Sequence, residues 1–173
     1  IVHAAGAYTD DVQARAGLVG SPMVRPTKGV HIAVSRDKLP LEAALVMNSR
    51  RDHRVTFALP WGDVTVIGTT DTDHGGSIYN VHADKNDVDY LLDVTRTYFP
   101  TIDLGYDEII STWAGLRPLL RTDQKFSYKV SREHAIMMDP SGVLTICGGK
   151  LTTCRKMAMD VVDSYLDHQP REV

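Results

Sequence analysis

The chain has 173 residues, of which 43% are hydrophobic, and a formal net charge of -3. This length and composition predict a globular domain of ordinary size, and the evenly scattered charges exclude the basic stripe that dominates nucleic-acid binding. No apolar run approaches the roughly 20 residues that cross a bilayer. The histidines form no HxH or HExxH pair, and Cys147 and Cys154 match no disulfide or metal motif. We therefore expect no metal site and no nucleic-acid partner.

The first residues, Ile1 to Gly6, are typical of a strand that is already under way, and we expect the chain to be cut from within a longer domain. A polar helix is predicted from Thr9 to Ala16. The segment 24–34 contains a turn with Pro and Gly, followed by a strand with three branched apolar residues on one face. His31 then points to the opposite face, because side chains alternate along a strand.

Three short β-rich segments predict an antiparallel meander; they are 46–48, 55–60 and 64–69. The polar segment 71–84 is a predicted loop, and 87–99 is a predicted helix with Asn86 or Asp87 as its N-cap. The remaining predicted elements are a strand over 109–120, a hairpin of 135–138 with 143–147, and a helix over 151–166 after a glycine turn.

The glycine turn places Gly148, Gly149, Lys150 and two threonines between a strand and the start of a helix. Free backbone N–H groups at such a place, together with the lysine charge, suit an anion or a polar cofactor edge. The alternative is an ordinary tight turn in which Thr152 or Thr153 caps the helix. The spacing alone leaves both interpretations open.

Two arginines lie at similar places, Arg117 at the end of a strand and Arg132 in a short link before the hairpin. Either one is consistent with a solvated surface charge. Together with Lys150 they provide the several charge-assisted donors that a phosphate needs. His31 is either a core histidine or an acid or base beside that anion. We expect the strands around these four residues to belong to one sheet and to share a pocket.

Six strings occur in order along nearly the whole chain: Val2 to Gly6, Arg25 to His31, Ile67 to Thr72, Trp113 to Leu120, Ser131 to His134 and Gly148 to Thr153. The set resembles the flavin-linked, respiratory glycerol-3-phosphate dehydrogenases. The resemblance implies a mixed α+β and α/β chain, part of a D-amino-acid-oxidase-like flavoprotein. It would hold an antiparallel substrate-binding sheet with flanking helices over 21–145. The end of a Rossmann-type FAD domain would occupy 1–20, and 146–173 would return to it.

The same resemblance implies roles for individual residues. Arg117 and Arg132 are similar to the family's phosphate ligands, Lys150 to a residue that bridges substrate and flavin, and His31 to the polar group beside the reacting hydroxyl. Of these four residues, His31, Arg117 and Lys150 would be catalytic. The implied flavin contacts are Ala5, Gly6, Gly148, Gly149, Lys150, Leu151 and Thr152. The chain departs from the family at Ala7-Tyr8-Thr9-Asp10, usually Pro-Trp-x-Asp, and at Cys154, usually Tyr.

The implied reaction oxidises sn-glycerol 3-phosphate to dihydroxyacetone phosphate with FAD, and electrons then pass to a quinone, or to oxygen in the related oxidases. The family further implies a location peripheral to the bacterial cytoplasmic membrane or the mitochondrial inner membrane, with homodimers as an expected assembly. Two other readings stay open: a relative that oxidises a 2-hydroxy acid or an amino acid, and a folded fragment without activity. No GxGxxG turn occurs in the chain, so we expect the isolated chain to be inactive without the rest of its enzyme.

Overall fold

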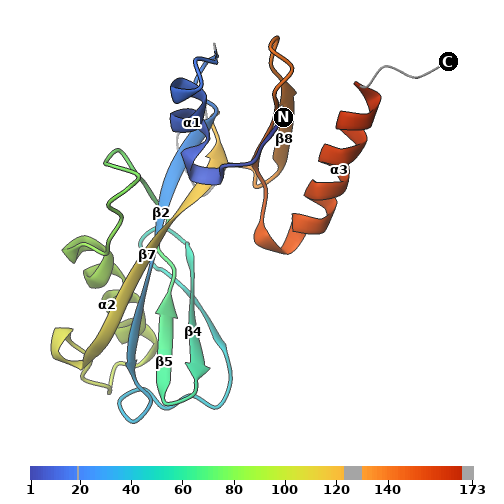
Figure 1. Ribbon diagram of the computed structural model, residues 1–173. Coiled ribbons are helices and arrows are strands. Elements are labelled where there is room, and N and C mark those ends of the chain that lie inside the picture. The colour runs from blue at the N-terminus through green and yellow to red at the C-terminus, as the bar shows by residue number, and fades with distance from the viewer. Residues whose placement is uncertain (19, 123–129, 169–173) are drawn as a thin grey trace. The chain divides into compact units, whose positions relative to one another are not determined.

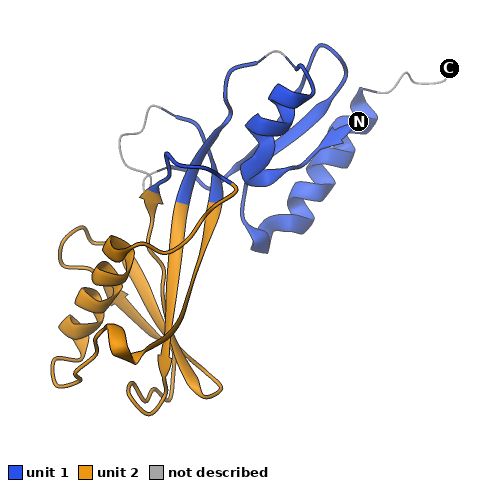
Figure 2. Cartoon of the chain, turned by 60° about the vertical axis from the view of Figure 1, so that its left-hand side comes forward, with its two compact units in different colours: residues 1–27, 73–78, 117–173 blue, residues 28–72, 79–116 orange. Residues whose placement is uncertain are grey.

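The computed structural model describes residues 1–18, 20–122 and 130–168. The chain forms two compact units, which Figure 2 shows in different colours. Unit 1 consists of residues 1–27, 73–78 and 117–173, and unit 2 consists of residues 28–72 and 79–116. In the described part of the chain, no helix combines the length and the apolar character that crossing a membrane requires.

Among the described residues, the larger sheet has six strands in the order β3-β4-β5-β2-β6, and β7 also pairs with β2 (Figure 1). The predicted antiparallel meander is confirmed, because β3 pairs with β4, and β4 with β5, in antiparallel register. The strands are β2 (Val24–Ser35), β3 (Leu45–Asn48), β4 (Val55–Trp61), β5 (Val64–Gly68), β6 (Thr72–Asp73) and β7 (Ile109–Leu120). Most of this sheet belongs to unit 2.

One face of the unit 2 sheet is buried under the helix α2 (Lys85–Tyr98), which lies alongside the strands in Figure 1. The alternation of β2 places Val30, Ile32 and Val34 in this core, each with no exposed surface, opposite Leu91 and Leu92 of the helix. The predicted orientation of β2 is therefore confirmed, and His31 lies on the other face. A short 3-10 helix, η2 (Tyr106–Glu108), precedes β7.

The N-terminus of α2 is fixed by a buried ionic cluster. The Asp84 carboxylate accepts hydrogen bonds from the N–H groups of Asn86 and Asp87, and the Asp87 carboxylate accepts one from the Asp84 N–H. The prediction of Asn86 or Asp87 as N-cap is wrong by two or three residues. The reason is a tertiary contact, because Lys28 of β2 donates to Asp84 at 2.6 Å and lies 2.5 Å from Asp87.

The smaller sheet lies in unit 1 and has the order β1-β9-β8, formed by β1 (Val2–His3), β9 (Leu144–Gly148) and β8 (His134–Met138). β8 and β9 form the predicted hairpin, whereas β1 runs parallel to β9. The helical elements of this unit are η1 (Gly6–Tyr8), α1 (Thr9–Arg15), η4 (Leu151–Thr153) and α3 (Cys154–Asp167). The free thiol of Cys147 is buried, and burial raises its pKa.

The turn predicted at the start of the segment 24–34 is not present in the structure. The segment 24–29 is extended within β2 rather than turned, because the Pro26 carbonyl accepts the His74 N–H at 3.0 Å and Arg25 forms a forked pair with Asp73. The predicted domains 1–20, 21–145 and 146–173 stay a prediction, since the compact units group residues by contacts alone. β8 groups with the terminal segments because it pairs with β9, and β9 pairs with β1.

Candidate functional site

The glycine turn after β9 has a backbone that only glycine accommodates. Gly148 and Gly149 have φ angles of 83° and 80°, in the left-handed region. A Cβ on Gly148 would overlap the Glu133 carbonyl, and a Cβ on Gly149 would overlap the sulfur of Met157. The Gly149 N–H donates to the same Glu133 carbonyl at 3.0 Å. The turn is therefore held by backbone contacts, and both glycines are required for it.

The threonines after this turn do not support the simple helix-cap interpretation. The side chain of Thr153, at the N-cap of α3, makes no cap hydrogen bond. Its hydroxyl donates instead to the Lys150 carbonyl at 2.9 Å and accepts from the Lys150 N–H at 3.2 Å. Lys150 and Leu151 are exposed, Leu151 to 89%. The two hydrogen bonds between Thr153 and Lys150 close a tight turn, from which the side chains of Lys150 and Leu151 are exposed next to the two glycines.

A second turn lies at the same edge of the unit 1 sheet. β1 and β9 are parallel neighbours, with Val2 opposite Leu144 and His3 opposite Thr145, so their carboxyl ends meet at one edge. Ala5 and Gly6 follow β1, and the glycine turn follows β9. Gly6 has a φ angle of 58°, and its carbonyl accepts the buried Thr9 hydroxyl at 2.8 Å. Ligands of α/β sheets bind outside the carboxyl ends of the strands, which is where both predicted cofactor segments lie.

The three predicted phosphate ligands lie on segments of unit 1 that meet at the glycine turn. The end of β7 contacts the turn through Leu120, whose Cγ is 3.1 Å from the Cβ position of Gly148. The link before β8 contacts it through the Glu133 carbonyl. Arg117 is therefore three residues from one contact, Arg132 one residue from the other, and Lys150 follows Gly149 directly. Both arginines are partly buried, whereas Lys150 is exposed.

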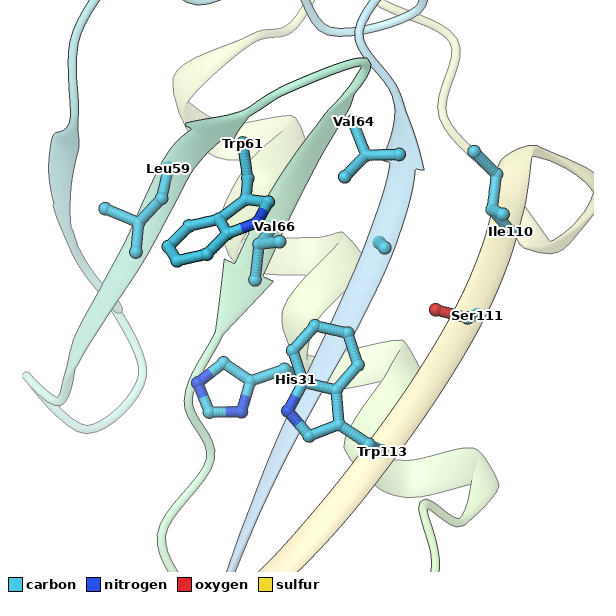
Figure 3. A pocket seen from close by; sticks show the side chains of 9 residues that line it. His31, Leu59, Trp61, Val64, Val66, Ile110, Ser111 and Trp113 are labelled. Atoms are coloured by element: carbon cyan, nitrogen blue, oxygen red, sulfur yellow. The ribbon is translucent and has the colours of Figure 1, made fainter.

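His31 lies in unit 2, on the sheet face that α2 does not cover. It is directly opposite Gly68 of β5, and a Cβ on that glycine would overlap the imidazole. The ring stacks on Trp113 of β7 with 5.3 Å between centroids and 8° between planes (Figure 3). Both side chains border a hollow of about 390 Å³, lined by His31, Ala33, Leu59, Trp61, Val64, Val66, Ile110, Ser111 and Trp113. His31 is thus a residue of an open apolar surface and not of the core.

The expectation that one sheet carries all four residues is wrong. His31 and Arg117 belong to strands of the six-stranded sheet, whereas Lys150 follows β9 of the three-stranded sheet and Arg132 precedes β8. The separation arises because β9 pairs with β1 and β8. The three cations fall in unit 1 and His31 in unit 2. Convergence of His31 with the cations in one pocket stays a prediction.

Several residues that shape these places were not singled out from the sequence. Gly68 and Trp113 were noted only as parts of longer strings, and His134 likewise. The His134 Nε2 lies 3.0 Å from the Asp160 Oδ2 of α3, and Lys156 donates to the other oxygen of Asp160 at 2.5 Å. This network ties α3 to the strand that contacts the glycine turn. A sequence signal exists only for the Lys156–Asp160 pair, which has helical spacing.

Comparison with known proteins gives consistent similarities over the whole chain. Residues 1–155 match the family described as FAD dependent oxidoreductase (DAO). A glycerol-3-phosphate dehydrogenase of Mycobacterium leprae is 38% identical over all 173 residues, and an aerobic glycerol-3-phosphate dehydrogenase of Staphylococcus aureus is 39% identical over 163 residues, 94% of the chain. The chain spans 29% of the length of each of these relatives.

A solved structure shows the same fold. The crystal structure of the glycerol-3-phosphate dehydrogenase from Bacillus halodurans, described as a complex with FAD, superposes with a TM-score of 0.83 and is 34% identical. The match covers 99% of the present chain and 33% of that protein. Both units of the present chain therefore have counterparts in one part of a longer chain.

Proposed function

Because the chain belongs to the FAD-dependent oxidoreductase family, we propose that it forms part of an enzyme that oxidises sn-glycerol 3-phosphate to dihydroxyacetone phosphate with FAD. The observation that carries the proposal is the edge of the unit 1 sheet. Two glycine-containing turns follow neighbouring parallel strands there, and three cationic residues lie on segments that form or contact one of these turns. The names of the similar proteins supply the substrate.

The residues at this edge fit a flavin. Gly148, Gly149 and, after β1, Gly6 all have left-handed φ angles. Because glycine has no side chain, a ligand can approach the backbone closely at these positions. We propose that Ala5, Gly6, Gly148, Gly149, Lys150, Leu151 and Thr152 contact FAD. When bound, FAD supplies the two-electron acceptor for the hydride of the substrate. The 173-residue chain alone is proposed not to retain the cofactor, since these turns do not replace a dinucleotide-binding motif.

The substrate phosphate is proposed to bind Arg117, Arg132 and Lys150. Arginine presents a planar fork that matches phosphate oxygens, and lysine adds a compact positive charge. The contacts of the Leu120 side chain and of the Glu133 carbonyl with the glycine turn support this grouping, since they bring the three segments together within unit 1. Arginines that are partly buried hold an anion more tightly than solvated ones, because water screens them less.

His31 is proposed to take the proton of the C2 hydroxyl while the C2 hydrogen leaves as a hydride, so that the carbonyl of dihydroxyacetone phosphate forms. An imidazole changes charge near neutral pH, as this role requires. The electrons are proposed to pass on to a quinone, with oxygen as the alternative acceptor. The location peripheral to the bacterial cytoplasmic or mitochondrial inner membrane and the homodimer are carried over from the family resemblance alone.

The test is the substitution Arg117→Ala in the intact protein that carries this chain. A charge-assisted hydrogen bond to an anion is worth roughly 1.5 to 3 kcal/mol, so kcat/KM for glycerol 3-phosphate should fall by about tenfold to somewhat more than a hundredfold. The loss for free glycerol, a poor substrate without the phosphate, should be much smaller.

The matched control is Arg51→Ala, since Arg51 is an exposed arginine of unit 2 that pairs with Asp93 at 3.1 Å on the surface. Arg51→Ala should leave kcat/KM nearly unchanged both for glycerol 3-phosphate and for glycerol. Equal losses for glycerol 3-phosphate and for glycerol in Arg117→Ala would contradict the role of Arg117 as a phosphate ligand. Oxygen consumption without added quinone would identify the oxidase alternative.

A further inference from the structure

The imidazole of His31 is held from two neighbouring strands. β5 and β7 both pair with β2, on opposite edges of that strand. On the β5 side, Gly68 leaves a space that the imidazole fills, because any Cβ at this position would overlap the ring. On the β7 side, the indole of Trp113 lies almost parallel to the imidazole, and Figure 3 shows the two rings next to each other.

We propose that Trp113 is a positioning residue, whose indole holds the His31 imidazole in the orientation from which it takes the substrate proton. The inference rests on the proposed function, which gives His31 that role. Aromatic rings prefer an offset-stacked arrangement, so an indole favours one plane and one lateral offset of its neighbour more strongly than an aliphatic side chain does. Proton transfer is sensitive to such placement, since misplacement of a catalytic group by about 1 Å can cost on the order of a hundredfold in rate.

The surroundings of the stacked pair favour this role. Seven of the nine residues that line the hollow are apolar or tryptophan, and His31 is the one ionisable side chain among these described lining residues. The side chain of Trp113 is 45% exposed, so the indole contributes less to stability than a fully buried one would. Contact with the imidazole gives this exposed indole a function.

A direct test uses the NMR signals of the His31 ring in the chain itself. Protons stacked under an indole are shifted upfield by its ring current, and His31→Gln identifies the signals by their loss. Trp113→Leu should abolish the upfield shift, and Trp113→Phe should keep part of it. The matched control is Trp61→Leu, which removes the other tryptophan of the same hollow and should leave the His31 signals in place.

The kinetic test uses the intact protein. Trp113→Leu should lower kcat by roughly ten- to a hundredfold with little change in KM for glycerol 3-phosphate, because Trp113 stacks on His31, whose proposed role is in the chemical step. Trp113→Phe should restore most of kcat, which a loss of folding would not allow. His31 signals that do not respond to Trp113→Leu would overturn the positioning role. A kcat that His31→Gln leaves unchanged would instead overturn the proposed role of His31, and the NMR result would distinguish the two failures.

Discussion

Unit 2 places His31 on a sheet whose core contains thirteen buried side chains, whereas unit 1 places its glycine turn beside two clusters of three buried residues each. In unit 2 the strands β2, β4 and β5 pack one face against α2, and the open face carries His31, the proposed proton acceptor. In unit 1 the position of the turn depends on the Glu133 carbonyl, on two left-handed glycines and on the parallel pairing of β9 with β1.

The difference shows two ways to hold a functional group still. Unit 2 derives its rigidity from side-chain burial, so its stability should follow the size of the core residues. Unit 1 derives the geometry of its turn from backbone contacts, so it should tolerate changes in its small clusters better than the addition of one methyl group at a glycine. Substitutions that separate these two sensitivities test the comparison.

The largest effect is expected for Leu91→Ala in α2. Leu91 is fully buried in the unit 2 core, and removing its side chain leaves a cavity that the packed sheet cannot fill. We expect a loss of about 3 to 4 kcal/mol in the free energy of unfolding of unit 2. Amide exchange should accelerate in β4 and β5 and stay unchanged in β8 and β9. Equal acceleration in both sheets would mean that the two units unfold together and that the comparison fails.

The next effect is expected at the glycine turn, in Gly148→Ala. The alanine would have to adopt a left-handed backbone conformation, which costs roughly 1 to 2 kcal/mol. Its methyl group would also displace the Glu133 carbonyl, at about 1 kcal/mol for the weakened hydrogen bond. We expect a loss of about 2 to 3 kcal/mol, observed as faster exchange of the Gly149 amide. The control is Gly115→Ala, where a Cβ meets no atom within 4 Å. A similar loss in both variants would contradict the steric argument.

The third effect concerns the ionic cluster at the start of α2. Lys28→Met leaves the Asp87 carboxylate, which is 3% exposed, without its cation. Breaking a buried pair costs roughly 3 to 5 kcal/mol. Because Asp84 is 48% exposed and solvent screens it, we expect about 2 kcal/mol. The matched control is Lys85→Met, which breaks the exposed pair with Asp89 and should have a much smaller effect on unfolding.

The pH dependence of this cluster has a definite sign. The hydrogen bond from Lys28 lowers the pKa of Asp84 below its ordinary value of 3.8, against the opposing effect of burial. A carboxyl group with a lowered folded pKa stabilises the fold above its unfolded pKa and loses this contribution as the pH falls through the folded value. The difference between the parent chain and Lys28→Met should therefore be constant at neutral pH and shrink below about pH 3.8.

Alternation and turn chemistry predicted most of the elements of the fold. The meander of β3, β4 and β5 and the helix α2 follow from the spacing of apolar residues, which is a local signal. The N-cap of α2 and the extended segment 24–29 could not be predicted in the same way. Asp84 is selected by Lys28, 56 residues away, and Pro26 is accommodated by the His74 N–H, 48 residues away. Both depend on contacts that sequence spacing does not reveal.

The candidate site was predictable as a set of residues but not as an arrangement. The glycine turn and the cations were identified from residue type and from the family resemblance. The pairing of β9 with β1 is a contact between the two ends of the chain, and it separates Lys150 from the sheet that carries His31. The position of the His31 side chain likewise depends on the strand register that places it opposite Gly68 and on its stacking with Trp113. Neither follows from a local pattern.

The smallest effect is expected for Asp160→Asn, which weakens the link between α3 and β8. Asp160 accepts hydrogen bonds from Lys156 and from His134. The Lys156 hydrogen bond is the main cause that lowers the pKa of Asp160 below 3.8, and His134 adds to it. Because the carboxylate is near solvent, the effect on unfolding should be below those of Leu91→Ala, Gly148→Ala and Lys28→Met.

Its pH dependence makes this small effect measurable. With a lowered folded pKa, Asp160 stabilises α3 above its unfolded pKa, and this contribution is lost as the pH falls through the folded value. Amide exchange of α3 should therefore accelerate in the parent chain as the pH falls below about 3.8, after correction for intrinsic rates. That acceleration should be reduced in Asp160→Asn and kept in Asp163→Asn, a control on the same helix. If the Gly149 amide responded as strongly as those of α3, the turn would depend on the α3 link as much as on Glu133. The statement that backbone contacts hold the turn of unit 1, whereas side-chain burial holds unit 2, would then be wrong.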